Sequence, residues 1–387
     1  MRPDDFGYLS NDNVYLDSAC QTLRPEPVIE TLNEYYHEYN SCGERVKYAW
    51  GKKVDERVED TRSKVLSLLK LSHRDYFTSF TLNTTYGINL ILNQLKTEGI
   101  TQVVTTDIEH NSPFLSTIAF ARKHGLPRVV LERDPDGSIN LNSADFTGAL
   151  VVVNTNSNID GRALSNVRDI VKKVHAQGGT IIIDAAQSMA HYHHGLEKLE
   201  ADAICFSAHK MYSASLGVMV VKKSLLERID TTFIGGGMVD DVTKDTYMLS
   251  ANSPNHIYTV FEAGLQAWGE IIALGQAIDW LRTVEKKSQI HNLAEQLHSF
   301  LDSQPGVHIT NSMPSTTMAF YHDKIDAHLL AEGLSTEGIM ARSGYFCCHY
   351  YLDHVMHYPP LLRFSLGHHN TQDDIDKTKA VLEKVFA

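Results

Sequence analysis

The feature that most constrains the fold is a series of short apolar segments, most of them rich in Val and Ile, that alternate with amphipathic stretches. Five of these segments are predicted to be buried strands, at residues 102–106, 128–132, 149–154, 180–184 and 203–207. A sixth, 216–222, is expected to be the last strand of the same sheet. Because strands that alternate with helical patterns are typical of parallel sheets, we predict an α/β domain with a large, mostly parallel sheet.

Helices are expected around these strands, over residues 27–39, 55–69, 84–95 and 164–176. In the last range Val167, Ile170 and Val174 recur at helical spacing, and the glycine pair at 178–179 can end the helix. Thr84 or Thr85 is the expected N-cap of the third helix, since a hydroxyl oxygen can accept a hydrogen bond from a free backbone N–H.

A second, smaller α+β domain is expected after the large sheet. A long helical pattern starts at Glu262, and beyond it shorter strands, such as 316–321 and 361–365, alternate with helices. We therefore expect a large domain at 15–270 and a small C-terminal domain at 271–387 that also includes 1–14.

Composition excludes several functional classes. The 387-residue chain has 35 Lys and Arg against 47 Asp and Glu, and its net charge of −12 disfavours binding to the phosphates of a nucleic acid. No apolar run approaches the ~18 residues that span a bilayer, and no secretory signal is visible at the N-terminus. Five cysteines are too few for a disulfide framework in a chain of this size. We expect a cytoplasmic protein that binds neither membranes nor nucleic acids.

Polar side chains that could bind a ligand follow the ends of three predicted strands. Asn154, Asp184 and Ser207 each end a strand, and His209 and Lys210 come shortly after Ser207. Ligands of open parallel sheets bind outside the carboxyl ends of the strands. We therefore expect these side chains to meet in one crevice.

This set of residues suits the chemistry of pyridoxal phosphate (PLP), because each part of that cofactor needs a particular kind of group. Lys210 can bind the aldehyde as a Schiff base, and the carboxylate of Asp184 can keep the pyridine nitrogen protonated. The phosphate needs hydroxyls, backbone N–H groups and preferably a helix N-terminus. The residues expected to hold it are Thr84, Thr85, Ser207 and His209.

Two motifs in the expected order and spacing make the chain resemble the class V aminotransferase-like family of PLP enzymes. They are D-x-x-Q at 184–187 and S-x-H-K at 207–210. Further segments that resemble the family lie at 15–19, 83–89, 109–111, 157–158 and 261–264. The resemblance implies PLP fold type I, with a mostly parallel seven-stranded sheet, and a homodimer with active sites between subunits. It also implies that His110 stacks on the pyridine ring, that Asn158 approaches the ring hydroxyl and that Gln187 belongs to the cofactor site.

Within that family the C-terminal part looks most like a group-II (SufS-like) cysteine desulfurase. Residues 342–347 match R-[ST]-G-x-x-C, in which the Cys is the sulfur-accepting nucleophile. Arg363 lies in an R-x-S segment whose Arg grips the substrate carboxylate, and Arg342 is the alternative anchor. The resemblance implies conversion of L-cysteine to L-alanine, with sulfur held as a persulfide on Cys347. A protein sulfur acceptor and a role in iron–sulfur cluster assembly would follow from it.

Of the two adjacent thiols, only Cys347 has the motif's spacing from Arg342, whose charge should favour a thiolate. Neighbours in an extended segment point to opposite sides, so Cys348 is expected to face away from the cofactor. The sequence departs from the family at Leu265, where Thr is usual, and at 345–346, where two His are usual. Three alternatives therefore stay open: a selenocysteine or other C–S lyase, an epimerase, and a non-catalytic sulfur or metal carrier.

A dense group of histidines, His191, His193 and His194, is conceivable as a metal site. A looser group lies between residues 349 and 369. Neither a Cys-x-x-Cys nor a His-Glu-x-x-His pattern accompanies them, so surface or core histidines are the favoured interpretation. We expect no metal site.

Overall fold

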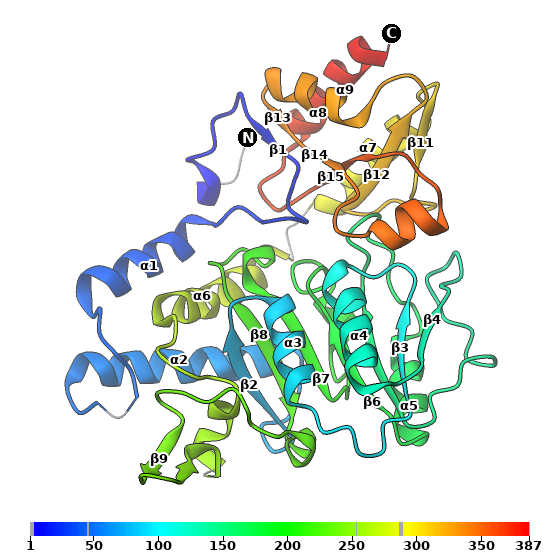
Figure 1. Cartoon of the computed structure of the whole chain (residues 1–387). Helices are drawn as coiled ribbons and strands as arrows, with labels where there is room; N and C mark the ends of the chain where they lie inside the picture. Colours follow the sequence, from blue (N-terminus) through cyan, green and yellow to red (C-terminus); the bar gives the residue numbers. More distant parts are fainter. Residues whose placement is uncertain (1–3, 45, 253, 286–288, 387) are drawn as a thin grey trace.

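A seven-stranded sheet forms the centre of the larger part of the molecule (Figure 1). The structure is a computed structural model that describes residues 4–44, 46–252, 254–285 and 289–386. The strand order is β2-β8-β7-β6-β5-β3-β4, where the strands are β2 (Tyr76–Thr81), β3 (Gln102–Thr106), β4 (Arg128–Leu131), β5 (Ala149–Asn154), β6 (Thr180–Asp184), β7 (Ala203–Ser207) and β8 (Gly217–Lys222). Strand β8 runs antiparallel to β2 and β7, and the other neighbouring pairs are parallel. The predicted fold class and all six predicted strands are confirmed, whereas β2 was not predicted.

The strands are apolar throughout because helices cover both faces of the sheet. Along β6, Ile181 and Ile183 pack into the core on one face and Ile182 into the core on the other, as the alternation of side chains along a strand requires. Helices α3 and α4 lie in front of the sheet in the view of Figure 1. The helices of this part are α1 (Glu26–Glu38), α2 (Ala49–Leu68), α3 (Thr84–Gln94), α4 (Asn111–His124), α5 (Val167–Ala176) and α6 (Trp268–Val284).

The N-cap of one helix and the starts of two others differ from the sequence prediction. The N-cap of α3 is Asn83, whose side chain accepts a hydrogen bond from the backbone N–H of Tyr86 at 2.9 Å, so neither Thr84 nor Thr85 is the cap. Helix α2 begins at Ala49, earlier than predicted, and α6 begins at Trp268, later than the pattern from Glu262 suggested.

The smaller part contains a four-stranded antiparallel sheet in the order β11-β12-β15-β14. The N-terminal segment belongs to this smaller part, because β1 (Val14–Tyr15) pairs with β13 (Ile339–Met340) in a separate two-stranded sheet. The remaining elements of this part are β11 (Val307–Ile309), β12 (Thr317–His322), β14 (Arg342–Gly344), β15 (Leu361–Ser365), α7 (Ile290–Asp302), α8 (Ala327–Thr336) and α9 (Gln372–Phe386). A short hairpin of β9 (Val239–Val242) and β10 (Tyr247–Leu249) projects from the larger part.

The two strands predicted for this part, 316–321 and 361–365, are confirmed as β12 and β15. The predicted domain boundary at residue 270 falls inside α6, whose buried residues contribute to the core of the large sheet. The division into domains stays a prediction. Among the described residues, no helix is both long enough and apolar enough to cross a membrane.

A buried ion pair joins α2 to the segment that precedes α6. Arg62 donates two hydrogen bonds to the Glu262 carboxylate, with distances of 2.7 Å from Nη1 to Oε1 and 2.6 Å from Nη2 to Oε2. Glu262 also accepts from the backbone N–H of Phe80 in β2 at 2.7 Å, and Arg62 Nη1 donates to the carbonyl of Thr78. Burial alone would lower the pKa of Arg62, but Glu262 outweighs it and raises that pKa above its ordinary value.

Glu262→Gln is therefore expected to destabilise the protein strongly, because it leaves the buried Arg62 with only the exposed carboxylate of Glu59, 3.9 Å away, as a counter-charge. Breaking one side of a buried pair costs about 3–5 kcal/mol, and the free energy of unfolding from a denaturant titration should fall by that order. Lys172→Gln is the control, because it breaks the exposed pair with Asp169 and should change stability by at most about 1 kcal/mol. Similar effects of the two substitutions would contradict this prediction.

Candidate active site

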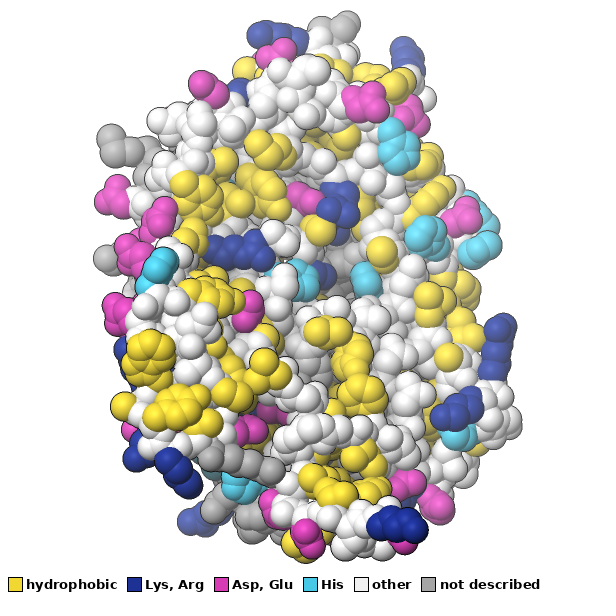
Figure 2. Space-filling view, turned by 60° about the vertical axis from the view of Figure 1, so that its left-hand side comes forward, with side chains coloured by type: hydrophobic (Ala, Val, Ile, Leu, Met, Phe, Trp, Pro, Cys, Tyr) yellow, Lys and Arg dark blue, Asp and Glu magenta, His cyan; other side chains and the backbone are white. Residues whose placement is uncertain are grey.

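A cavity of about 310 Å³ lies where the carboxyl ends of the central strands meet the smaller part of the molecule. In Figure 2, basic and histidine side chains gather around a hollow near the middle of the face. The structure brings every sequence-predicted site residue to this cavity: Thr84, Thr85, His110, Asn158, Asp184, Gln187, Ser207, His209, Lys210, Arg342, Cys347 and Arg363. Asn154, which ends β5, lines it as well.

The acid and the amine of the site come from two neighbouring strands. Asp184 is the last residue of β6, and Lys210 ends the single turn η3 (Ala208–Lys210) that follows β7. Burial raises the pKa of Asp184, against a hydrogen bond from the backbone N–H of Ala186 and the charge of Lys210. Burial also lowers the pKa of Lys210, with Asp184 opposing the shift. A larger share of neutral amine results, which is the form that reacts with an aldehyde.

The start of α3 and the end of β7 form a cluster of hydroxyl and backbone donors. Thr84 donates its backbone N–H to Ser207 Oγ at 2.9 Å, and the two hydroxyl oxygens lie 2.6 Å apart. The hydroxyl of Thr85 bonds to that of Ser112 at the start of α4. Free N–H groups and a positive dipole end make a helix N-terminus favourable for an anion such as phosphate.

The histidines of the cavity are neutral at physiological pH. Burial, together with the charges of Lys210 and Arg363, lowers the pKa of His110 to about 3. Its Nδ1 accepts a hydrogen bond from the backbone N–H of Ser112 at 3.0 Å, which makes it the N-cap of α4 and fixes the ring. Burial and Lys210 lower the pKa of His209 to about 4. Both rings can therefore contact a ligand as uncharged planes.

Two amides predicted to contact the cofactor also tie loops together. Asn158 Nδ2 donates to the carbonyl of Phe346 at 2.7 Å, and Gln187 Nε2 donates to the carbonyl of Ala19 at 2.8 Å. Each amide thus links the larger part to a segment of the smaller part that lines the cavity. No sequence motif indicated these two bonds.

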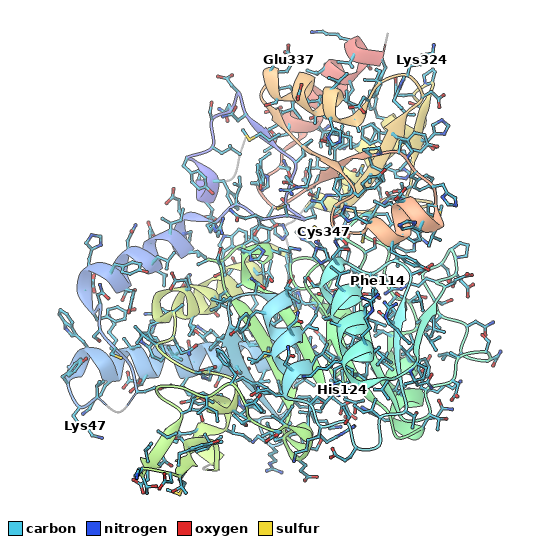
Figure 3. The ribbon with its side chains drawn as sticks, viewed as in Figure 1. Lys47, Phe114, His124, Lys324, Glu337 and Cys347 are labelled. Atoms are coloured by element: carbon cyan, nitrogen blue, oxygen red, sulfur yellow. The ribbon has the colours of Figure 1, made fainter. Side chains whose placement is uncertain are left out.

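The adjacent cysteines differ in accessibility. Cys347 is exposed and lies between the smaller part and the start of α4 (Figure 3), where its carbonyl accepts from the backbone N–H of Asn111. Cys348 is buried, its Sγ donates to the carbonyl of Glu109 at 3.1 Å, and burial followed by Glu109 raises its pKa well above the ordinary value. Cys347 is therefore the thiol that a ligand in the cavity can reach.

The reason given for this difference in the sequence prediction was wrong. The segment is not extended: Phe346 and Cys347 both have left-handed backbone conformations, with φ of 47° and 58°. A left-handed pair reverses the chain direction, and that reversal separates the two thiols. The guanidinium of Arg342 bonds to Asp17 and to Cys20. Its expected effect on the Cys347 thiolate stays a prediction.

Asp17 organises both arginines, a role that the sequence analysis did not assign. Arg363 Nη2 donates to Asp17 Oδ1 at 2.9 Å, and Arg342 Nε donates to Oδ2 at 3.0 Å. Arg363 Nη1 donates to the carbonyl of Asn158 at 2.8 Å, whereas its buried Nε has no hydrogen-bond partner among the described residues. Burial lowers the pKa of Arg363, against the charge of Asp17. The free Nε is a place for a ligand carboxylate.

Comparisons with known proteins agree with this geometry. The sequence matches the family described as aminotransferase class-V over residues 14–378. It is 28% identical to a protein named "Probable cysteine desulfurase" from Methanothermobacter thermautotrophicus, over 97% of this chain and 96% of the relative. A protein of the same name from Pyrococcus abyssi is 29% identical over 88% of this chain and 86% of its own length.

Solved structures resemble the whole fold. The apo structure of a cysteine desulfurase from Thermococcus onnurineus NA1 superposes with a TM-score of 0.89 and 26% sequence identity, and covers 100% of this chain and 98% of its own. The match to the family extends over both sheets and over each residue of the cavity named above. The chain belongs to the aminotransferase class-V family.

Proposed function

We propose that this chain is a PLP-dependent cysteine desulfurase, which converts L-cysteine to L-alanine and holds the sulfur as a persulfide on Cys347. The observation that carries the proposal is that one cavity brings together a buried Lys–Asp pair and an exposed thiol: Lys210, Asp184 and Cys347. The names of the relatives and of the superposed structure support the same activity.

The residues of the cavity fit PLP as a cofactor. Lys210 offers an amine with a lowered pKa for the aldehyde, and the buried Asp184 would regain its charge beside a protonated ring nitrogen. Thr84 and Ser207 offer hydroxyls beside a helix N-terminus for the phosphate, and the neutral ring of His110 can stack on a pyridine. When bound, PLP supplies an electron sink for the substrate carbon that carries the amine.

Three side chains would act on the substrate itself. Arg363 holds the carboxylate through its unpartnered Nε, and the amine of Lys210 removes the α-proton. The thiolate of Cys347 then attacks the substrate sulfur, so that an S–S bond forms as the C–S bond breaks. The electron pair of the broken bond stays on carbon, which takes up protons to give alanine.

The placement of Cys347 favours this activity over the lyase and epimerase alternatives, because neither reaction needs a protein thiol beside the substrate. The five cysteines are free in the structure, and the mechanism requires a reduced thiol at Cys347. We therefore also propose a cytoplasmic location, where thiols are kept reduced. The exposure of Cys347 supports transfer of the sulfur to a protein acceptor.

Lys210→Ala is expected to abolish the covalent adduct that borohydride fixes between PLP and the protein. Lys210 is the one lysine that lines the cavity in the described part of the chain, so no other amine can replace it. Mass spectrometry of the borohydride-treated protein measures the adduct. Lys123→Ala, at the exposed end of α4, is the control and should keep it. A retained adduct in Lys210→Ala would place the attachment elsewhere.

Cys347→Ser is expected to bind PLP normally but to lose sulfur transfer, whereas Cys348→Ser should keep substantial activity. The reason is accessibility, because Cys348 is buried against Glu109 and Asn158. Alanine release and a labile sulfur adduct, detected by mass spectrometry after incubation with cysteine, are the two measurements. An adduct on Cys348 alone would refute the assignment. Full C–S cleavage in the double mutant would favour the lyase alternative.

We also propose that the chain acts as a homodimer, on the basis of the family resemblance. Leu265 is 76% exposed, which fits a position that faces a neighbouring subunit. Light scattering at micromolar concentration should give twice the monomer mass of 43.4 kDa. A mass of 43.4 kDa under those conditions would rule the dimer out.

A further inference from the structure

A second group of ligand-type side chains lies apart from the cavity. It consists of His193 and His194, which begin the short turn η2 (His193–Leu196), and Glu285, which directly follows α6. One ligand atom from each residue lies within 4.8 Å of the others. Chain positions far apart in the sequence thus meet in one cluster.

The spacing within this cluster suits a small metal ion. His193 Nδ1 lies 3.3 Å from Glu285 Oε1, and His194 Nε2 lies 3.7 Å from Glu285 Oε2. In a tetrahedral zinc site with bonds of about 2.0–2.1 Å, neighbouring ligand atoms are about 3.3–3.4 Å apart. The cluster would need only small side-chain adjustments to reach that geometry.

An unpartnered nitrogen points to a missing ligand. The side chain of His193 is 2% exposed, and its Nδ1 makes no hydrogen bond among the described residues, although Glu285 Oε1 lies 3.3 Å away. Buried polar atoms of this kind are rare in folded proteins because they lose their bonds to water.

The second histidine is held in the manner typical of metal sites. His194 Nδ1 lies 2.8 Å from Glu197 Oε1, which orients the ring and directs Nε2 toward Glu285. Metal-ligating histidines usually donate their other ring N–H to such a carboxylate. His194 is 67% exposed, so the open side of the cluster faces solvent.

We propose that His193, His194 and Glu285 bind a divalent first-row transition ion, best matched by Zn²⁺, with water in the fourth position. Two imidazole nitrogens and one carboxylate oxygen are ligands that Zn²⁺ accepts readily. The ion would clamp the end of α6 to the turn η2, which follows β6 in the chain. The sequence analysis expected no metal here, because nothing near His194 in the sequence indicates that Glu285 lies beside it in the fold.

The test is Zn²⁺ titration of the PLP-loaded, chelator-treated full-length protein. Calorimetry should show one equivalent of Zn²⁺ whose binding is lost in His194→Gln and in Glu285→Gln, both of which alter side chains outside the core. Glu197→Gln should weaken the affinity about 10–100-fold, because it removes the carboxylate behind His194. Zn²⁺ should also raise the melting temperature of the wild type but not that of Glu285→Gln.

His308→Gln is the matched control, because His308 lies 2.7 Å from Asp323 as another exposed His–carboxylate pair. It should leave the Zn²⁺ affinity unchanged. Zinc bound by the thiols of the cavity would be unaffected by any of these substitutions, so only the equivalent lost in the two ligand variants reports on the cluster. Wild-type binding in either ligand variant, or no binding at micromolar Zn²⁺, would overturn the proposal.

Discussion

The pairing of Asp17 with Arg363 is the contact on which the rest of the site depends. Asp17 comes from the N-terminal segment and Arg363 from the second sheet, so their ion pair joins these two parts of the chain beside the cavity. Arg342 shares the same carboxylate, which leaves one positive charge of the two arginines unmatched within this trio. A substrate carboxylate would neutralise that charge. The attraction between opposite charges is strongest in a partly dry environment such as this cavity. The trio therefore favours a ligand that carries a carboxylate, before any contact with a cofactor is considered.

The cavity also depends on side chains that reach it from two different parts of the molecule. The parallel strands bring Asp184 and Lys210 to one edge of the large sheet, as such sheets do for their ligands. The thiol arrives from the smaller part on a loop that is fixed by two bonds, from Asn111 to the carbonyl of Cys347 and from Asn158 to that of Phe346. The residues proposed to hold the cofactor and the thiol proposed to accept sulfur thus lie on different parts of the molecule, and these bonds set the distance between them.

The features predicted correctly from the sequence depend on local residue patterns. The features that were missed depend on residues that are far apart in the chain. Strands such as 149–154 and 180–184 were found because burial on both faces requires an unbroken apolar run. Strand β2 was missed because Tyr76–Thr81 alternates aromatic residues with Thr and Ser and lacks that run. The partners of Arg342 were not predicted, because Asp17 and Cys20 lie more than 300 residues away in the chain. Motif spacing identified which residues belong to the cavity, but only the packed structure shows how they pair.

The backbone of the cysteine loop has an energetic consequence of its own. A non-glycine residue in the left-handed region costs roughly 1–2 kcal/mol, and Phe346 and Cys347 occupy that region in succession. The loop therefore has a strained backbone conformation. Its two hydrogen bonds to the larger part hold it there, against the intrinsic backbone preference of these residues. Any event that weakens those bonds, such as the added bulk of a second sulfur atom on Cys347, would release conformational energy as the loop extends. Cys347, the proposed sulfur acceptor, thus lies on a segment of the cavity wall whose outward movement would relieve backbone strain.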